Sequence, residues 1–377
     1  MLVLKNGRIL DPMNGVDMSA DLVVEGDKIY KIGTAEPAVG DNVIDASGCI
    51  VTPGLIDHHT HLAPFAKIGL PAEAVCFASG VTTAVDAGST GCANYSERRA
   101  FLKYTKLGIK AYLNVCSTGL DIMPENLNPA HYDEVALREL FQEYPDELLG
   151  LKVRTSAPIV RELGYGPVRT AVNLGEKLGV HVMVHSTNPP GQLSELLDIL
   201  NPGDILTHMY MNQGSCLVEE GKVITAAYRA RSRGVLFEAA DARLHFGIDV
   251  ARVAIQEGFY PDILATDVTK LSMHLRPTAF NLAMQISKYT HLGIPLEKTI
   301  EICTATPARQ MGIENQIGSL TVGQAADIAV FLPVNKENIF GDRPNGNQNQ
   351  VVSMGRVVYK PVLTVKNGEM VYRDILF

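Results

Sequence analysis

Hydrophobic and polar positions follow one pattern at the two ends of the chain and another in its middle. Near the start, apolar and polar residues alternate around the pairs Asn6-Gly7 and Gly26-Asp27, in VLKNGRILD (3–11) and DLVVEGDKIYKIG (21–33). Alternation is typical of strands, and such pairs favour hairpin turns. Similar segments recur near the end, in ADIAVFLP (326–333), VVSMGRVVYK (351–360) and VLTVKNGEMVYRD (362–374).

The tripeptide Lys5-Asn6-Gly7 also recurs, as Lys366-Asn367-Gly368. Asn-Gly turns are common in any β-rich segment, so the repeat by itself requires no pairing. Our interpretation is that residues 1–52 and 317–377 together form one small β-sandwich domain, with residues 53–316 inserted between them.

The middle of the chain alternates short apolar runs with helical patterns. The runs, each ending in polar residues, are Leu55–His61, Val81–Asp86, Ile109–Cys116, Leu148–Arg154, Val180–His185, Asp204–His208, Gly234–Glu238 and Asp262–Asp267. The helical patterns are Tyr95–Leu107, Ala136–Glu143, Gly166–Leu178, Ser194–Leu200, Val223–Arg233, Val250–Glu257, Thr278–Leu292 and Thr304–Gly312. This order predicts an α/β protein whose residues 53–316 form a (β/α)8 TIM barrel. An open doubly wound sheet is the alternative, but the sequence has no GxGxxG or GxxxxGK[ST] loop to support it.

Charge and composition narrow the class of partner. With 33 basic and 41 acidic residues among 377, the net charge of −8 argues against nucleic acid and anionic membranes as partners. No apolar stretch is long enough to span a bilayer, and the start of the chain lacks an export signal. The six cysteines are scattered, which is typical of reduced thiols. We therefore expect a cytoplasmic protein that acts on a small molecule.

Polar residues stand where the predicted barrel strands end, which is where barrel enzymes place their sites. Strand alternation puts His59 and His61 on one face with Asp57, whereas His58 and Thr60 face away. The later predicted strands end in Lys152, Arg154, His185, His208 and Asp267. The remaining histidines, His131, His181, His245 and His291, are expected to lie outside the site.

Each of these residues also has a purely structural explanation. A strand-end histidine is often only hydrogen-bonded, Asp267 could cap a turn, and Lys152 could pair with Glu238. Together they favour a metal site, because several strands would otherwise each place a costly polar group at the same end. Imidazole and carboxylate ligands without thiolates suit Zn²⁺, with Mn²⁺, Co²⁺ or Fe²⁺ as alternatives. The neutral amine of Lys152 could take up CO₂, and the carbamate would be an anionic ligand able to bridge two metals.

These motifs resemble those of the amidohydrolase superfamily. VTPGLIDHHTHL (51–62) is similar to its PGxIDxHxH signature, and its later strands resemble GLKVR (150–154), VMVHS (182–186), LTHMY (206–210) and LATD (264–267). Its C-terminal end resembles TATPARQMG (304–312), IGSLTVGQAADIAVF (317–331) and TVKNGEMVY (364–372).

The resemblance implies a site with two divalent metal ions. His59, His61 and Asp267 would bind one ion, His185 and His208 the other, and carbamylated Lys152 would bridge them. A hydroxide held between the metals would attack a carbonyl, and Asp267 would pass its proton to the leaving group. The resulting site is net positive, which favours an anionic substrate.

Within the superfamily, the sequence is most similar to poorly characterised deacetylases related to dihydroorotase. Dihydroorotases are expected to carry an arginine two residues after His61, where this chain has Ala63. The predicted reaction is therefore hydrolysis of an N-acyl or O-acyl bond, with acetyl preferred, in a small carboxylic acid. Alternatives are opening of a cyclic amide, deamination of a heterocycle such as adenine, or a barrel that binds ligands without catalysis. Members of the family also lead us to expect a homo-oligomer.

The motifs indicate the metal ligands, but they do not identify the residues that contact the substrate. Arg154 follows Lys152 on the same strand face and could hold a substrate carboxylate, or else pair with Asp86 or Glu238. Further candidates for contacts with the substrate are Asn114, Tyr210 and His274.

Overall fold

A closed barrel of parallel strands forms the middle of the chain in the computed structural model, which describes residues 1–62, 68–69, 71–102, 104–273 and 275–377. Its strands follow one another in chain order: β6 (Leu55–Thr60), β7 (Val81–Gly91), β8 (Gly108–Asn114), β9 (Leu148–Arg154), β10 (His181–His185), β11 (Ile205–Thr207), β14 (Leu236–Ala240) and β15 (Ile263–Ala265). A parallel bridge between Thr60 and Val268 joins the last strand region to the first. The predicted TIM barrel is confirmed, and each of its strands overlaps a predicted apolar run.

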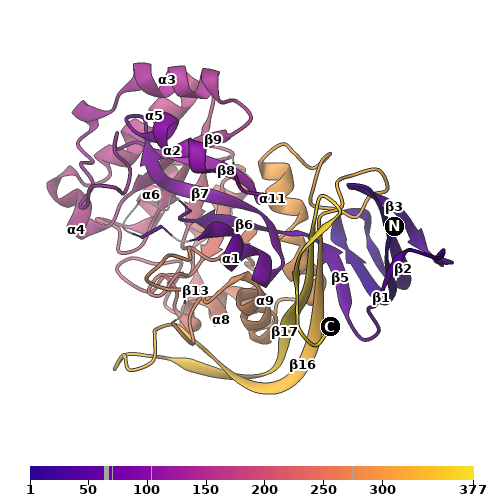
Figure 1. Ribbon diagram of the computed structural model, residues 1–377. Helices are drawn as coiled ribbons and strands as arrows, with labels where there is room; N and C mark the ends of the chain where they lie inside the picture. The colour runs from indigo at the N-terminus through magenta and orange to yellow at the C-terminus, as the bar shows by residue number, and fades with distance from the viewer. Residues whose placement is uncertain (63–67, 70, 103, 274) are drawn as a thin grey trace.

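Helices connect these strands or, in the case of the last three, follow the final strand, and they cover the barrel from outside (Figure 1). They are α2 (Tyr95–Leu102), α3 (Glu134–Glu143), α5 (Gly166–Leu178), α6 (Leu193–Ile199), α7 (Thr225–Ser232), α8 (Ile248–Gln256), α9 (Leu282–Leu292), α10 (Leu296–Glu301) and α11 (Ala305–Gln310). The prediction matches α5 at both ends. The helix stops where Gly179 adopts φ 71°, a left-handed conformation that glycine reaches without a steric penalty. The short helices α1 (Ala72–Cys76) and α4 (Ala157–Val160) were not predicted.

Strands from both ends of the chain share one second sheet. From the start come β1 (Leu2–Asp11), β2 (Val16–Glu25), β3 (Lys28–Gly33), β4 (Asn42–Asp45) and β5 (Ile50–Pro53); from the end come β16 (Ile328–Gly341), β17 (Val352–Lys366) and β18 (Glu369–Arg373). The two groups meet where β5 pairs antiparallel with β16, with Val51 opposite Val330. A buried apolar cluster that includes Leu4, Val51 and Val365 lies against this sheet. The division into domains at residues 52 and 317 stays a prediction.

Two of the three predicted turn pairs lie in hairpin turns, and one does not. Gly26-Asp27 joins β2 to β3, and Asn367-Gly368 joins β17 to β18. Asn6-Gly7 instead lies inside β1, where the register against β2 shifts between Leu4 and Gly7. The predicted turn is therefore a β-bulge. Asn6 takes φ 62° there, and its backbone N–H donates to Asp21 Oδ1 at 2.9 Å, which holds the bulge in place.

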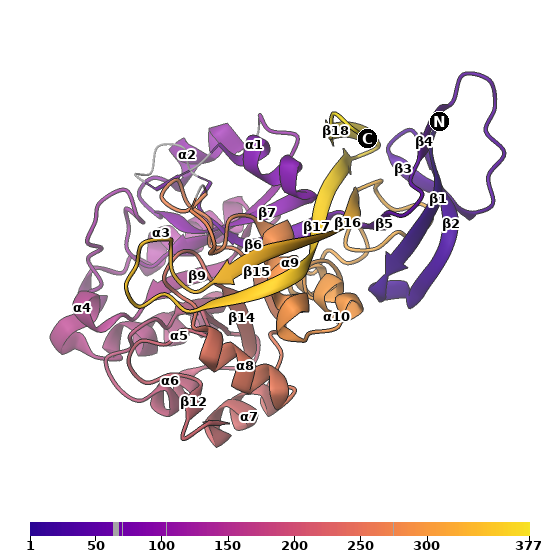
Figure 2. The ribbon, with the colours of Figure 1, turned by 90° about the horizontal axis from the view of Figure 1, so that it is seen from below.

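The long strands β16 and β17 run from this second sheet along the barrel and past α9 (Figures 1 and 2). Their contacts with α9 include a hydrogen bond from Tyr359 N to Ser287 Oγ at 3.0 Å and a 2.7 Å contact between His291 Nε2 and Ser353 Oγ. We call the hairpin of β16, β17 and the connecting residues 342–351 the arm. Because the arm follows the barrel wall, residues near the chain's end reach the loops around the barrel's mouth.

Among the helices of the described residues, none combines the length and the apolar composition that crossing a membrane requires.

Candidate active site

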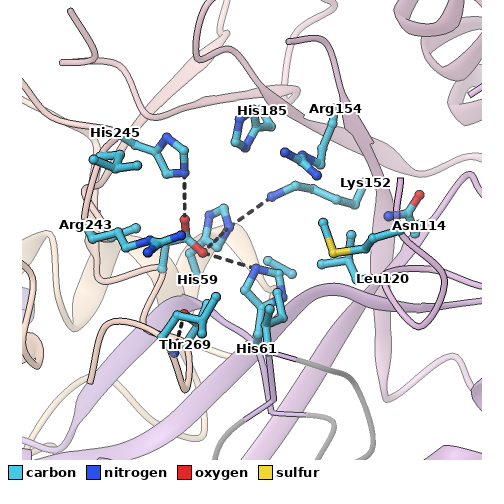
Figure 3. A pocket seen from close by; sticks show the side chains of 17 residues that line it. His59, His61, Asn114, Leu120, Lys152, Arg154, His185, Arg243, His245 and Thr269 are labelled. Atoms are coloured by element: carbon cyan, nitrogen blue, oxygen red, sulfur yellow. Dashed lines mark hydrogen bonds and ion pairs between the residues drawn. The ribbon is translucent and has the colours of Figure 1, made fainter. Parts of the chain in front are cut away.

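A cavity opens where the barrel strands end, and most of the predicted site residues line it (Figure 3). The predicted residues in its wall are His59, His61, Asn114, Lys152, Arg154, His185 and Asp267. His208 is not in that wall but lies next to it, with its Nε2 2.8 Å from His185 Nδ1. The structure therefore brings together all the residues that the sequence predicted as metal ligands.

His59 and His61, at the end of β6, both direct their Nε2 atoms into the cavity. Their Nδ1 atoms are held from behind, His59 by Glu238 Oε1 at 2.7 Å and His61 by Ser89 Oγ at 2.9 Å. His59 Nε2 then lies 3.0 Å from Lys152 Nζ, and His61 Nε2 lies 3.1 Å from Asp267 Oδ1. A partner on Nδ1 fixes the ring and leaves Nε2 as the atom available to a metal.

Asp267 occupies a sharp backbone turn just after β15. Its φ is 49°, and its backbone N–H donates to His59 O at 2.7 Å, so the turn is tied to the first barrel strand. Burial raises the pKa of its carboxyl, but the surrounding histidines, above all His59, outweigh burial and hold that pKa well below its ordinary value. The turn thus presents a carboxylate that has one oxygen 3.1 Å from His61 Nε2 and the other 4.0 Å from His208 Nε2.

Lys152 is buried, with its side chain among imidazoles. Its Nζ lies 3.0 Å from His59 Nε2 and 3.4 Å from Met183 Sδ, and no carboxylate of the described chain lies within ion-pair distance. The alternative pairing with Glu238 is therefore not formed. Burial lowers the pKa of Lys152 to about 8, although Asp267 and Glu238 act against that shift. More of this lysine is therefore neutral near neutral pH than of an ordinary exposed lysine, although the charged form still predominates.

A third histidine, His245, joins His185 and His208, so the prediction that it lies outside the site is wrong. The ring of His245 lies 4.8 Å from that of His185 and 4.4 Å from that of His208. Thr187 Oγ1 holds its Nδ1 at 2.9 Å, and its Nε2 is 3.7 Å from Asp267 Oδ2. His245 belongs to a loop after β14 and not to a strand end, so the strand-end rule could not find it.

The β6 residues next to the motif also differ from the prediction. A register shift between Asp57 and Thr60 breaks the strict alternation of side chains. Asp57 accepts hydrogen bonds from Thr266 N at 3.0 Å and Thr266 Oγ1 at 2.7 Å, so it holds the neighbouring strand and does not line the cavity. His58 lies beneath the site, with its Nδ1 2.7 Å from Glu238 Oε2. Glu238, which the sequence suggested only as a counter-ion, therefore orients both His58 and His59.

The predicted substrate contacts have mixed outcomes. Arg154 lines the cavity but pairs with Glu125, Nη1 to Oε2 at 2.8 Å, and with neither Asp86 nor Glu238. The amide of Asn114 is used locally, because it accepts from Cys116 N at 2.9 Å and donates to Gly88 O at 3.2 Å. Tyr210 was wrongly predicted as a contact.

Tyr210 is 1% exposed, and its hydroxyl donates to Phe259 O at 2.9 Å in the barrel wall. His274 lies outside the described residues.

The donor set fits divalent metal ions. Ligand atoms of His59, His208 and Asp267, and those of His185, His208 and His245, lie within 4.8 Å of one another in each group. His185 Nε2 is buried without a hydrogen-bond partner in the described part of the chain. Burial lowers the pKa of His185 and His208 well below the ordinary value, so both imidazoles are neutral and offer lone pairs. Neutral imidazoles with one carboxylate and no thiolate suit zinc and its neighbours in the first transition row.

Sequence comparison decides the family. Residues 50–358 match the amidohydrolase family. The chain belongs to this family. A deacetylase of Agrobacterium fabrum is 32% identical over 363 residues, which is 94% of this chain and 87% of that protein. A deacetylase of Brucella anthropi is 33% identical over 325 residues, covering 84% of this chain and 80% of its own.

Solved structures are also similar to this chain. A dihydroorotase superposes with a TM-score of 0.89 at 30% identity, covering 99% of this chain and 100% of that one. An adenine deaminase gives the same TM-score at 24% identity with 99% coverage of both chains, and at that identity it indicates the fold alone. The protein is therefore a hydrolase of a family that uses a metal centre and acts on carbon–nitrogen bonds of small molecules.

Proposed function

We propose that this amidohydrolase removes an acyl group, acetyl by preference, from the nitrogen or oxygen of a small carboxylic acid. The observation that carries the proposal is the pair of ligand groups that share His208, at a cavity whose wall also contains Lys152, Arg154 and Arg243. The two ligand groups could hold the metal ions that hydrolysis at a carbonyl requires. The positive charge in the wall suits a substrate with a carboxylate. The relatives named deacetylase support the acyl group.

The proposed ligands fall into two sets. His59, His61 and Asp267 would hold one metal ion, and His185 and His208 the other. Zinc is our first choice, with manganese, cobalt or iron as alternatives. Bound divalent ions supply Lewis acidity at the carbonyl and lower the pKa of water enough to provide a nucleophile near neutral pH.

We propose that Lys152 carries a carbamate. The amine nitrogen attacks the carbon of CO₂, a C–N bond forms, and one proton leaves to solvent. The product would be an anionic oxygen ligand for the proposed metal site. A buried lysine without a counter-ion, 3.0 Å from His59 Nε2, has the surroundings that such a modification needs.

Asp267 is the proposed proton carrier. Its Oδ1 lies 3.1 Å from His61 Nε2 and its Oδ2 lies 3.7 Å from His245 Nε2, so the carboxylate stands at the centre of the site. It would accept the proton of the attacking water and deliver it to the leaving nitrogen or oxygen. His245 would face the same leaving group from the side of the β14 loop.

Ring opening of a cyclic amide is the second candidate function. The solved dihydroorotase at 30% identity favours it, because that enzyme belongs to the same family and covers this chain almost completely. The absence from the sequence of an arginine at position 63 counts against dihydroorotate itself. The oligomeric state and the cytoplasmic location expected from the sequence stay predictions.

A turnover screen tests the proposal. Zinc-loaded protein would be offered N-acetyl amino acids of both hands, O-acetyl hydroxy acids, dihydroorotate, hydantoins and adenine, with Asp267→Asn as the inactive control. We expect hydrolysis of at least one acetylated acid by the wild-type protein and none by the variant. Turnover confined to the cyclic amides or to adenine would contradict the acyl assignment.

A further inference from the structure

The two arginines that line the cavity have different surroundings. Arg154 is already neutralised, because its Nη1 lies 2.8 Å from Glu125 Oε2 and the Glu125 side chain is fully buried. Arg243 is exposed and forms no hydrogen bond or ion pair with any part of the chain that the structure describes. In Figure 3 its side chain extends from the loop after β14 into the ring of cavity residues, between His245 and Thr269.

The backbone that carries Arg243 is held firmly although the side chain is not. Ala242 takes φ 45°, its N–H donates to Thr266 O at 2.8 Å, and its carbonyl accepts from Ala279 N at 3.1 Å. The N–H of His245 donates to Asp241 O at 3.0 Å. These bonds fix the loop on both sides of Arg243.

Two other parts of the molecule hold the same loop. Asp241 is buried, and its carboxylate is bound by Lys288 Nζ and by Tyr289 Oη, the latter at 2.9 Å. From the arm, Arg343 Nη1 donates to Phe246 O at 2.7 Å. A free guanidinium on a fixed base is organised in advance for an anion, since binding then orders only one side chain.

We propose that Arg243, and not Arg154, provides the main contact for the carboxylate of the substrate. This inference rests on the proposed function. A guanidinium presents paired N–H donors that match the two oxygens of a carboxylate, and an unpaired one keeps both its donors and its charge for the ligand. Arg154 offers less charge to a ligand because Glu125 balances it, and its place is to shape the wall beside Lys152.

The position of Arg243 also sets the geometry of the substrate. It precedes His245 by two residues, and His245 Nε2 is 3.7 Å from Asp267 Oδ2. A substrate whose carboxylate is held by Arg243 would therefore place its scissile bond within a few atoms of Asp267. The predicted substrates are acyl derivatives of small α-amino or α-hydroxy acids, in which the carboxylate and the acylated nitrogen or oxygen are attached to the same carbon.

Binding of an inert pair of probes tests this inference without turnover. N-(methylphosphonyl)glycine and its carboxamide share the phosphonyl group and differ only in the charge of the far end. Calorimetric titration of the zinc-loaded protein would give the Kd of each probe for the wild type and for Arg243→Met, Arg243→Lys and Arg154→Met. Arg229→Met, at an exposed position on α7, is the matched control for losing one surface arginine.

We expect Arg243→Met to raise the Kd of the acid probe about tenfold or more and to leave the Kd of the carboxamide probe within about twofold of the wild-type value. Arg243→Lys should recover part of the loss, because charge remains without the paired donors. If Arg154→Met weakens binding of the acid probe and Arg243→Met does not, the inference is overturned and the proposed function stands. A wild-type protein that binds neither probe would overturn the proposed function and this inference with it.

Discussion

At the scale of single residues, the site depends on which group lies behind each proposed ligand. His59 is fixed by Glu238 and His61 by Ser89, so both rings present Nε2 to the cavity. The sequence could predict which histidines meet at the cavity, because a strand end determines where a side chain points. It could not predict Glu238 as the group behind His59, since that contact joins residues 179 positions apart.

Replacing Glu238 with glutamine should lower metal affinity about 10–100-fold, because the neutral amide polarises the His59 ring less and orients it less firmly. Metal titration of the apoprotein with zinc measures the effect. Thr207→Val is the matched variant, since Thr207 Oγ1 also lies near His59 Nδ1, at 3.1 Å, but carries no charge. A larger loss for Thr207→Val than for Glu238→Gln would refute the role given to Glu238.

Lys152→Ala should lower metal affinity more than about 100-fold, because it removes a proposed ligand, whereas Glu238→Gln changes only a group that orients a ligand. The alanine leaves space but no bridging oxygen, so a short carboxylic acid such as acetate or propionate should restore part of both metal content and turnover. Elemental analysis with and without the acid gives the first readout. A variant that keeps its full metal content would show that Lys152 bridges nothing.

At the scale of elements, helix α9 holds the loop that brings His245 and Arg243 to the cavity. Lys288 is 0% exposed and pairs with Asp241, which begins that loop. The helix was predicted from its periodicity. The loop was not, because its path depends on a positive φ at Ala242 and on contacts with distant segments. The Asn6-Gly7 bulge could not be predicted for the same reason. It depends on pairing with β2, and only that pairing shows that the chain does not turn at this point.

Removing one partner from a fully buried ion pair leaves an uncompensated charge, so Lys288→Met should reduce the free energy of unfolding by about 3–5 kcal/mol. Urea unfolding followed by circular dichroism measures it. Lys298→Met is the control, because Lys298 forms a partly exposed pair with Glu301 at 2.9 Å and its loss should cost at most about 1 kcal/mol. Equal midpoints for the two variants would contradict this account of α9.

At the scale of the whole molecule, the end of the chain supports the barrel's mouth. The arm places Arg343 against Phe246 O and against Asn212 Oδ1, the latter at 2.6 Å, so the second sheet and the site loops are mechanically connected. The sequence predicted the pairing of the two chain ends from similar strand patterns. It gave no sign of the arm's path, because that path depends on side chains that meet only after folding.

Arg343→Met should loosen the connection between the arm and the loop after β14. We expect faster amide hydrogen exchange in residues 242–247 and 342–351, with little change in the barrel strands, because exchange reports local opening. Arg356→Met, at an exposed position on the arm, is the matched control. Unchanged exchange at residues 242–247 would mean that Arg343 does not hold that loop.

We infer above all that His59, His61, His185, His208, Lys152 and Asp267 form a centre for two metal ions. Elemental analysis of protein prepared with zinc and bicarbonate, together with its turnover of acetylated acids, tests that claim most directly. We expect close to two metal ions per chain and activity that is lost with a chelator and restored with zinc. Fewer than about one metal ion per chain under these conditions would contradict it.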